Sequence, residues 1–565
     1  MRDMTMKKAI SMTRLLLAPV VLTLWLAASA FAAVPGIQGP TFSLTAQPAY
    51  LNQPDGSAVY SWGYGCLSPT QTFLPTAIPT PAGGCPTMQV PGPTLIVTEG
   101  QTVSVTLTNQ LPTAAGNTSI LFPGFQVTTS GGVVGLLTQE ATPGGTVTYS
   151  FPTTGQPGTH PYYSGTQGDL QIEMGLYGAI IVLPNAVPAN CTSGYHAANL
   201  AAEANFGEHD FRLSQAAYDH PASCYDREYL FQWAEMDSRI HRQALAEVSD
   251  PIRVAACLAA PNTSGQRPGC SLDVQTEPYH PAYFLINGRS MPDLMDPNYA
   301  SEYPHQPYNG NPHMHPGELT LIRTIGQGRW QHPFHEHANH VRILARDGNL
   351  VLSSSTTPIT YTSGLAGDAG ASGPGLAGIL QFNTDTTPGE SFDGIFYFTG
   401  RGLNWDPYGH HPVSSTGDSL ATLSCTPDAN GYNTGDPTAV NFFEWCQDHN
   451  KPVQVAPFGD VAGGGPATLP DPNVFTNGAW YGGTPYLGPD ASLRASMPAC
   501  AGTPAANCTT LNPANVQANP ANERGWAFMW HSHNEREITT NNVFPGGMLM
   551  MMLVDSREFV IDEGL

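Results

Sequence analysis

The same order of strand-like segments occurs twice in this chain, and this repeat constrains the fold more than any other feature. The first copy extends from "PGPTLIVTEGQTVSVTLTNQLP" (91–112) to "GLYGAIIVLPN" (175–185), and the second from "GELTLIRTI" (317–325) to "PGGMLMMMLV" (545–554). Apolar and polar residues largely alternate in the first of these segments, as on strands with one buried face. Each copy therefore predicts one antiparallel sandwich.

Three further segments stand in corresponding order within each copy. In the first copy they are "SILFPGFQV", "PGGTVTYSF" and "GTHPYYSG", and in the second "HPFHEHANHVRILARDG", "PGESFDGIFYF" and "RGWAFMWHSH". Helical periodicity is hard to find, whereas short runs rich in Val, Ile and Thr recur between turn residues. These observations predict an all-β fold of tandem Greek-key β-sandwiches.

The repeat also predicts the domain organisation. The first domain is expected at 40–185, a linker at 186–224, and the second domain at 225–558. Residues 403–522 interrupt the second copy and are rich in Gly, Pro, Asn, Asp and Ala, which predicts a long loop insertion. The insertion is interpreted as a disulfide-braced surface loop, with a lid over the histidine face as the alternative. A third sandwich within 186–300 also stays open.

The N-terminal segment has the pattern of an export signal. A basic start precedes the apolar run "LLLAPVVLTLWLAASAFA", and Ala30-Phe31-Ala32 forms an A-x-A cleavage signal. We expect residues 1–32 to be removed, so that a secreted or periplasmic protein begins near Ala33; a membrane anchor is the alternative. No later stretch is long and apolar enough to span a bilayer.

Charge excludes two classes of partner. The chain holds 21 basic and 44 acidic residues. Residues 1–32 contain four of the basic residues and one of the acidic residues, so the exported protein would carry 17 basic and 43 acidic residues. Lys451 is the only lysine beyond residue 32. Such an acidic surface repels nucleic acid and anionic lipid, and neither is expected as a partner.

The ten cysteines predict structural disulfides, because their number is even and the chain is expected to be exported. They occur as near neighbours in the sequence, although sequence alone does not fix their connectivity. The couples are Cys66/Cys85, Cys191/Cys224, Cys257/Cys270, Cys425/Cys446 and Cys500/Cys508.

Two H-x-H pairs in the second copy are candidates for metal binding. His335 and His337 belong to "HPFHEH", and His531 and His533 belong to "HSHNERE". On a strand, residues i and i+2 point to the same face and lie roughly 6–7 Å apart. Four imidazoles that converge on an exposed strand face would suit Cu(II) or Zn(II).

Taken in order, these segments resemble the multicopper oxidases, which are built from cupredoxin domains. "PGPTLIVTEGQTVSVTLTNQLP" is similar to the opening of their first domain, "HPFHEH" to their H-P-x-H-x-H motif, and "HSHNERE" to their H-C-H-x-x-x-H motif. The resemblance covers most of the chain except the insertion. It implies cupredoxin-like sandwiches, a trinuclear copper site that reduces O2, and a type 1 copper that delivers electrons to it.

This sequence departs from the family pattern in its first domain. Leu121 and Pro123 stand where the family has an H-x-H pair, and Tyr163 and Gly165 stand at the histidines of its Y-H-S-H motif. Four of the eight trinuclear ligands that the resemblance implies are therefore absent. The four that remain are His335, His337, His531 and His533.

The type 1 motif is altered as well. His332 is present, but Ser532 replaces the cysteine and Glu537 replaces the second histidine. A serine hydroxyl is not ionised at neutral pH and cannot replace a soft thiolate on copper. The sequence therefore predicts that no blue copper centre forms.

Several other residues near these motifs could take part in metal binding. His340 and Glu537 are further candidate ligands, while Glu336, Glu535 and Glu537 could orient imidazoles or be solvated loop carboxylates. His313 and His315 form a third H-x-H pair, interpreted as a polar strand start. Met548, Met550 and Met552 alternate, which favours a core face over a thioether site.

The functional hypothesis is an exported, copper-binding multicopper-oxidase homologue with oxidoreductase activity on a small molecule or a metal ion. Copper is the expected metal, with zinc or manganese as alternatives. The competing hypothesis is a non-enzymatic metal-binding or assembly module on the same scaffold. A homo-oligomer is a further possibility, because two-domain members of the family hold the copper cluster between subunits.

Overall fold

The computed structural model describes most of the chain between Ala33 and Ile561. The described residues are 33–259, 270, 272–353, 359–361, 371–373, 375–398, 424–429, 431–446, 483–486, 525–555, 557 and 559–561. The predicted signal peptide, Cys500, Cys508 and most of the predicted insertion 403–522 lie outside the described residues.

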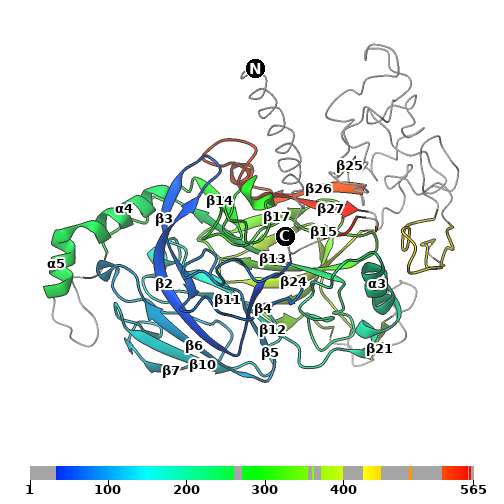
Figure 1. Cartoon of the computed structure of the whole chain (residues 1–565), viewed down its shortest axis with the longest axis horizontal. Helices are drawn as coiled ribbons and strands as arrows, with labels where there is room; N and C mark the ends of the chain where they lie inside the picture. Colours follow the sequence, from blue (N-terminus) through cyan, green and yellow to red (C-terminus); the bar gives the residue numbers. More distant parts are fainter. Residues whose placement is uncertain are drawn as a thin grey trace, which may run out of the picture.

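Two sheets of five strands form a first sandwich from residues 36–183 (Figure 1). One has the order β11-β12-β5-β1-β4 and the other β3-β2-β6-β10-β7. The strands are β1 (Gly36–Gln38), β2 (Thr41–Asn52), β3 (Ala58–Cys66), β4 (Phe73–Leu74), β5 (Leu95–Thr98), β6 (Thr102–Asn109), β7 (Thr128–Gly131), β10 (Thr146–Pro152), β11 (Gly158–Tyr163) and β12 (Tyr177–Leu183), while β8 (Val133–Val134) and β9 (Gln139–Glu140) form a separate pair.

A second sandwich is built from residues 227–555. Its inner sheet has the order β14-β13-β16-β24-β18-β19 with β22 beside β18, and its outer sheet has the order β15-β27-β26-β17-β23 with β25 beside β26. The strands are β13 (Arg227–Met236), β14 (Tyr283–Ile286), β15 (His313–Met314), β16 (Leu319–Gly326), β17 (His332–Glu336), β18 (Val341–Arg346), β19 (Asn349–Leu350), β22 (Leu380–Gln381), β23 (Asn383–Thr386), β24 (Ser391–Tyr397), β25 (Gly483–Tyr486), β26 (Gly525–Ser532) and β27 (Leu549–Asp555), and β20 (Ile359–Tyr361) pairs with β21 (Ala371–Gly373).

Helices are few and mostly connect strands. They are α2 (Gly168–Gln171), α3 (Gly194–Asn205), α4 (Ser238–Ser249), α5 (Pro251–Ala259) and the short 3-10 turns η1 (Thr113–Ala115), η2 (Ala189–Thr192), η4 (Asp293–Met295) and η9 (Glu535–Ile538). The predicted all-β fold with tandem sandwiches is confirmed. The described part of 186–300 contributes helices and two strands, β13 and β14, that join the second sandwich. The domain boundaries stay a prediction.

Alternating apolar residues explain why each pair of sheets closes. In the second sandwich, Phe231 on β13 and Phe396 on β24 pack against Phe334 on β17 and Trp530 on β26 in one buried cluster. Met548, Met550 and Met552 lie in that cluster as well, which agrees with the core interpretation of the methionines. The hydrophobic interior therefore fixes which face of each strand points outward.

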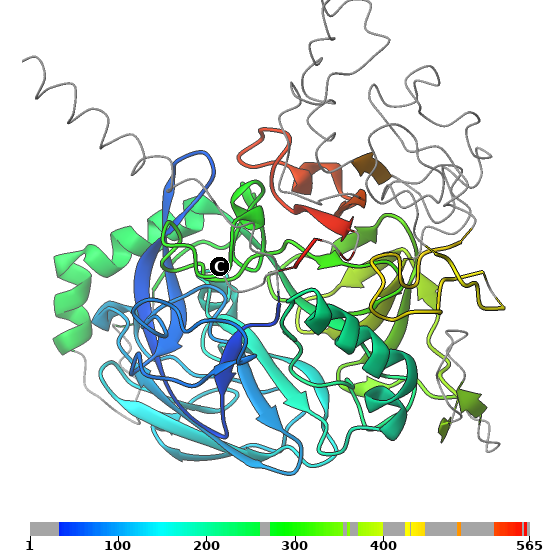
Figure 2. The same cartoon turned by 45° about the vertical axis from the view of Figure 1, so that its right-hand side comes forward.

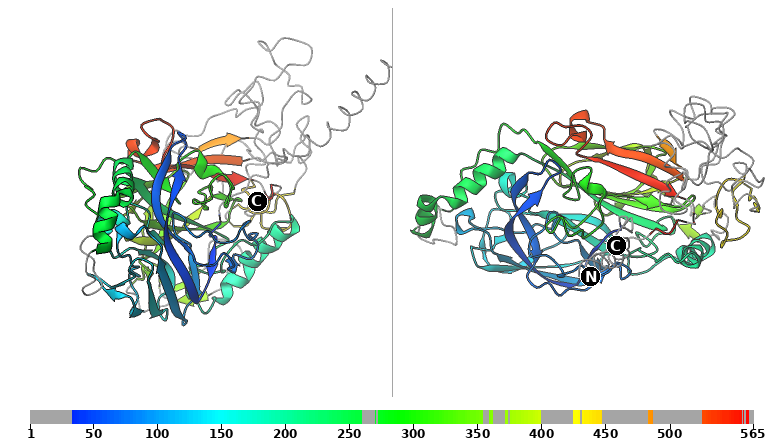
Figure 3. Two further views of the ribbon diagram at one scale, coloured as in Figure 1. Left: turned by 60° about the vertical axis from the view of Figure 1, so that its left-hand side comes forward. Right: turned by 45° about the horizontal axis from the view of Figure 1, so that its top comes forward.

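The four sheets are stacked in a defined order. Ala179 and Ile181 on β12 pack against Leu230 on β13 and Ile325 on β16, so the first sandwich covers the outward side of the inner sheet. Polar contacts reinforce this interface, as the Thr159 hydroxyl donates to Asp393 on β24 at 2.6 Å. The outer sheet with β17, β26 and β27 thus faces away from the first sandwich, which Figures 2 and 3 show.

One predicted strand is absent. "SILFPGFQV" contains only an isolated bridge between Leu121 and Tyr163, because the chain turns at Pro123 and Gly124, where φ is 87°. Ile120 and Phe122 are still buried in the core of the first sandwich. The apolar pattern of this segment therefore reflects burial of an irregular loop.

Four of the five predicted disulfides are confirmed by the structure. They join Cys66 to Cys85, Cys191 to Cys224, Cys257 to Cys270 and Cys425 to Cys446. The fifth couple, Cys500 and Cys508, lies outside the described residues. Within the described part of the chain, no helix has the length and hydropathy needed to cross a bilayer.

Candidate metal centre

The register between β17 and β26 brings the two histidine motifs together. His335 lies directly opposite His531, and Phe334 lies opposite Ser532. Because side chains alternate along a strand, Phe334 and Ser532 point into the sandwich while His335 and His531 point outward. The structure therefore separates each motif into an inner and an outer part.

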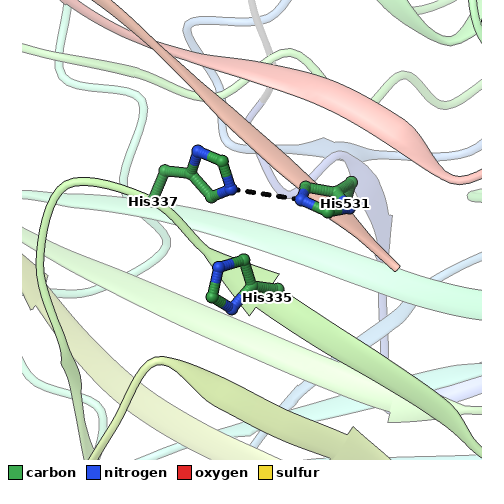
Figure 4. A group of neighbouring side chains, drawn as sticks. All are labelled: His335, His337 and His531. Atoms are coloured by element: carbon green, nitrogen blue, oxygen red, sulfur yellow. Dashed lines mark hydrogen bonds between the residues drawn. The ribbon is translucent and has the colours of Figure 1, made fainter. Parts of the chain in front are cut away.

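Three outer histidines form one cluster (Figure 4). Ring nitrogens of His335, His337 and His531, one from each residue, lie within 4.8 Å of one another. The Nε2 atoms of His337 and His531 are 3.1 Å apart. His337 follows the end of β17, and the next residue, Ala338, has a φ of 85°, a conformation that alanine rarely adopts. The backbone turn at Ala338 thus comes immediately after the cluster.

Burial favours the neutral form of two of the clustered imidazoles, those of His335 and His531. His335 is 3% exposed, and His337 and His531 are each 6% exposed, so the expectation of exposed strand histidines is wrong for these three. Burial, together with the neighbouring His531 and His533, lowers the pKa of His335 to about 4. Burial also lowers the pKa of His531. Neutral imidazoles with available lone pairs are the form that binds metal ions.

His533 and His340 lie at the margin of the cluster. The ring of His533 is 4.8 Å from that of His335, but its side chain is 49% exposed. His340 packs on Phe382, whose ring also contacts His335. Of the predicted ligands, the structure thus brings three into one close group and leaves His533 beside it.

The inner part of the motifs holds an ion-pair network. His332 is fully buried, with Nδ1 2.8 Å from Glu537 Oε2 and Nε2 2.8 Å from Glu235 Oε2. The Ser532 hydroxyl donates to the same Glu537 oxygen, and Asn534 Nδ2 donates to the other at 2.8 Å. The inner positions of the two motifs are therefore occupied by hydrogen-bonded side chains.

This network sets the charge of His332. Burial by itself would lower the pKa of His332, but hydrogen bonds to Glu235 and Glu537 outweigh it and raise the pKa to about 9. His332 and Glu537 were candidate ligands in the sequence, and here they are partners of one another. Both ring nitrogens of His332 face carboxylates, so neither is directed toward the outer cluster.

The three carboxylates in the motifs have different environments. Glu535 has a 77% exposed side chain and is the solvated loop residue that the sequence suggested. Glu336 is buried and accepts a hydrogen bond from Thr384 at 2.8 Å, and burial raises its pKa well above the ordinary range. The solvated interpretation is therefore wrong for Glu336 and Glu537, which is also buried.

The third H-x-H pair lies at a strand start, as the sequence predicted, because β15 begins at His313. His313 and His315 are buried, and their Nε2 atoms pair with Asp555 and with Glu208, the latter at 3.0 Å. Sequence analysis missed these partners, and it also missed Glu235. For Glu235, the available signal was a carboxylate within the strand-like segment "REYLFQWAEMD".

In the first sandwich, side-chain packing occupies the four positions where the family pattern has histidines. These positions are Leu121, Pro123, Tyr163 and Gly165. Leu121 is hydrogen-bonded to Tyr163 through the backbone, and a Cβ at Gly165 would lie 2.8 Å from the Leu121 Cγ. Leu121 therefore fills the space that a larger side chain at Gly165 would need.

Comparisons with known proteins agree with this architecture. Residues 87–187 match the family model described as multicopper oxidase. Laccase-24 from Oryza sativa subsp. japonica is 35% identical over 131 residues, which is 22% of this chain and 20% of the laccase. The chain thus aligns with about a fifth of the length of that relative.

Solved structures with an overall likeness include the multicopper oxidase mgLAC and a blue copper oxidase from Nitrosomonas europaea. The multicopper oxidase mgLAC is 14% identical, and the likeness covers 91% of this chain and 86% of mgLAC. The Nitrosomonas europaea oxidase is 13% identical, and the likeness covers 91% of this chain and 85% of that oxidase. Both structures have a TM-score of 0.41. At such scores, neither likeness supports residue-level correspondence. The match to the multicopper oxidase model and the laccase segment show that part of this chain is similar to multicopper oxidases.

Proposed function

We propose that this protein is an exported, copper-binding multicopper-oxidase homologue whose metal site is the outer histidine cluster. The observation that carries the proposal is the convergence of His335, His337 and His531 within 4.8 Å. Metal–imidazole bonds are about 2 Å long in zinc sites, so two nitrogens 3.1 Å apart match two ligands of one ion. An all-imidazole donor set suits Cu(II) or Zn(II), and the family implies copper.

Each residue of the cluster has a definite role in this proposal. His337 and His531 provide the close nitrogen pair, His335 completes the set, and His533 lies at the exposed margin where a small molecule or metal ion can approach. A bound copper would supply one-electron exchange with a small reductant, a metal ion or O2. Burial raises the pKa of Glu336, which disfavours a charged carboxylate beside the cluster.

Electron delivery in this protein would differ from that of a laccase. The hydroxyl of Ser532 is hydrogen-bonded to Glu537, and Glu537 is paired with His332. No thiolate is available at this position, so a reductant would have to act directly at the outer cluster.

The experiment is copper analysis of the purified protein after loading at neutral pH. We expect about one bound copper per chain in the wild type and its loss in the His337→Ala/His531→Ala variant. Because these residues are buried, the His337→Gln/His531→Gln variant retains side-chain volume and guards against misfolding. His280→Ala, at an exposed position, is the control and should bind copper like the wild type. Full copper stoichiometry in a folded double variant would refute the assignment.

A second candidate function is a non-enzymatic metal-binding or assembly module. The filled type 1 position favours it, because that position has lost the ligand set for electron entry. Oxygen uptake by the copper-loaded protein in the presence of small reductants separates the two. Uptake that is lost with the cluster histidines supports an oxidoreductase, whereas bound copper without uptake supports the module.

A further inference from the structure

The residues directly after the predicted cleavage site are buried at the junction of the two sandwiches. Ala33 is 6% exposed and contacts Ile78 and Phe211, and Val34 is fully buried. Val34 packs in the cluster that joins β12 to β13 and β16. From Gly36 the chain enters the first sandwich as β1. The start of the expected mature chain is thus fixed on both sides by tertiary contacts.

Ala33 lines a small pocket with charged walls. The pocket volume is about 10 Å³, which is roughly the room for one water molecule and excludes an organic ligand. Its charged lining includes the carboxylates of Glu203, Asp210, Asp226 and Glu228 and the guanidinium groups of Arg212 and Arg227.

One of these carboxylates stands apart from the others. Asp210 pairs with Arg212 at 2.9 Å, Asp226 with His196 at 2.8 Å, and Glu228 with Arg323 at 2.9 Å. Glu203 is 5% exposed and accepts a hydrogen bond from Asn199 at 3.2 Å. Arg227 and Arg212 favour its ionised form from a longer range, but no ion pair of Glu203 forms among the described residues. A buried carboxylate without a cation in direct contact is costly, so the pocket offers a place for one positive charge beside it.

We propose that processing between Ala32 and Ala33 creates this charge, and that the new α-ammonium group of Ala33 pairs with Glu203. A signal peptidase hydrolyses the peptide bond: water adds, the C–N bond breaks, Ala32 keeps a carboxylate and Ala33 takes up a proton as an ammonium. The inference rests on the proposed export. It explains why a pocket too small for a ligand is lined by acidic groups and by Ala33 itself.

Two further observations support the pairing. Burial raises the pKa of the Glu203 carboxyl well above its ordinary range, and a cation in contact would restore the ionised form. Because Ala33 is buried, the peptide bond has to be cut before this segment docks. Removal of the leader would then be linked to closure of the junction between the sandwiches.

The first experiment identifies the N-terminus of the protein exported from cells that express the full chain. We expect the N-terminal peptide, measured by mass spectrometry, to begin at Ala33. An uncleaved chain would contradict both the export proposal and this inference. A chain that begins at another residue would overturn only the inference and leave the copper site untouched.

The second experiment measures acylation of the amino groups. A chain that begins at Ala33 has two amines, the α-amine and Lys451, so Lys451 serves as an internal reference for reagent dose. We expect the native α-amine to react at least about tenfold more slowly than in urea-unfolded protein. Glu203→Gln should raise its native reactivity about tenfold, because the ammonium loses its partner and deprotonates more readily.

Matched variants make the acylation result decisive. Glu203→Asp retains the charge and should react more slowly than Glu203→Gln, whereas Glu302→Gln, at an exposed position, should match the wild type. Wild-type reactivity of the α-amine in folded Glu203→Gln would overturn the pairing.

Discussion

The alternation of side chains on β17 and β26 assigns different roles to neighbouring residues. His335 and His531 point outward into the candidate metal cluster, while His332 and Ser532 point inward into the ion-pair network. A shift of one residue in either strand would exchange these roles. Loss of the cysteine therefore changes the inner site and leaves the outer histidines in place.

The inner network predicts the outcome of restoring the thiolate. We expect copper-loaded Ser532→Cys protein to lack the intense blue absorption of a type 1 site, because Glu537 replaces an imidazole and both nitrogens of His332 face carboxylates. Visible spectroscopy checks this, with Ser532→Cys/Glu537→His as the matched variant that restores both ligands. An intense blue band in the single variant would show that a thiolate and His332 suffice.

The raised pKa of His332 predicts a fall in stability at alkaline pH. Its folded-state pKa of about 9 exceeds the reference value of 6.5, so the stabilisation is fully present below about pH 6.5 and is lost as pH rises through 9. The shift corresponds to about 3 kcal/mol.

This dependence is measured as the free energy of unfolding in denaturant between about pH 6.5 and 9.5. The wild type should lose stability over this interval more steeply than His332→Gln, which cannot carry the charge. Parallel pH profiles of the two proteins would exclude His332 as the titrating group.

At the scale of elements, most of the predicted strands are present, whereas α4 was not predicted. The segment "PGGTVTYSF" contains β10, whose alternating burial suits a half-buried strand, and "PGESFDGIFYF" contains β24, which is buried along most of its length. The structure also contains α4, in "SRIHRQALAEVS", where Ile240, Ala244 and Val248 recur every four residues and are buried. This short helical period was present in the sequence and was missed among the many strand-like runs.

The buried face of α4 predicts a stability effect. Ile240 is fully buried in the core of the first sandwich, so we expect Ile240→Ala to lower the free energy of unfolding by about 2–5 kcal/mol. Arg242→Ala, on the exposed face of the same helix, should change it by no more than about 0.5 kcal/mol. Equal effects of the two substitutions would show that α4 does not pack as described.

At the scale of the whole molecule, the first sandwich meets the second through its inner sheet, where Ala179 and Ile181 pack against Leu230 and Ile325. The clustered histidines come from β17, the residue after it and β26 of the outer sheet. A homo-oligomer that brings another surface to the histidine face stays a prediction.

The oxidation state of the cysteines is also a property of the whole chain. Eight cysteines form four disulfides in the structure, and we expect Cys500 and Cys508 to form a fifth. Thiol labelling of the denatured, unreduced protein should detect no free thiol, with reduced protein as the positive control. Detection of two thiols per chain would show that the last couple is reduced.

The sequence by itself determined the all-β class, the repeated sandwich and the shared strand face of each histidine pair, and it indicated the cysteine couples without fixing their connectivity. Each of these depends on local spacing, such as the period of two along a strand, which is visible in the letters. Only the tertiary structure decided that His335, His337 and His531 form the close group and that Glu235 and Glu537 hold His332. Those contacts join residues that are far apart in the chain, and the register and stacking of the sheets bring them together.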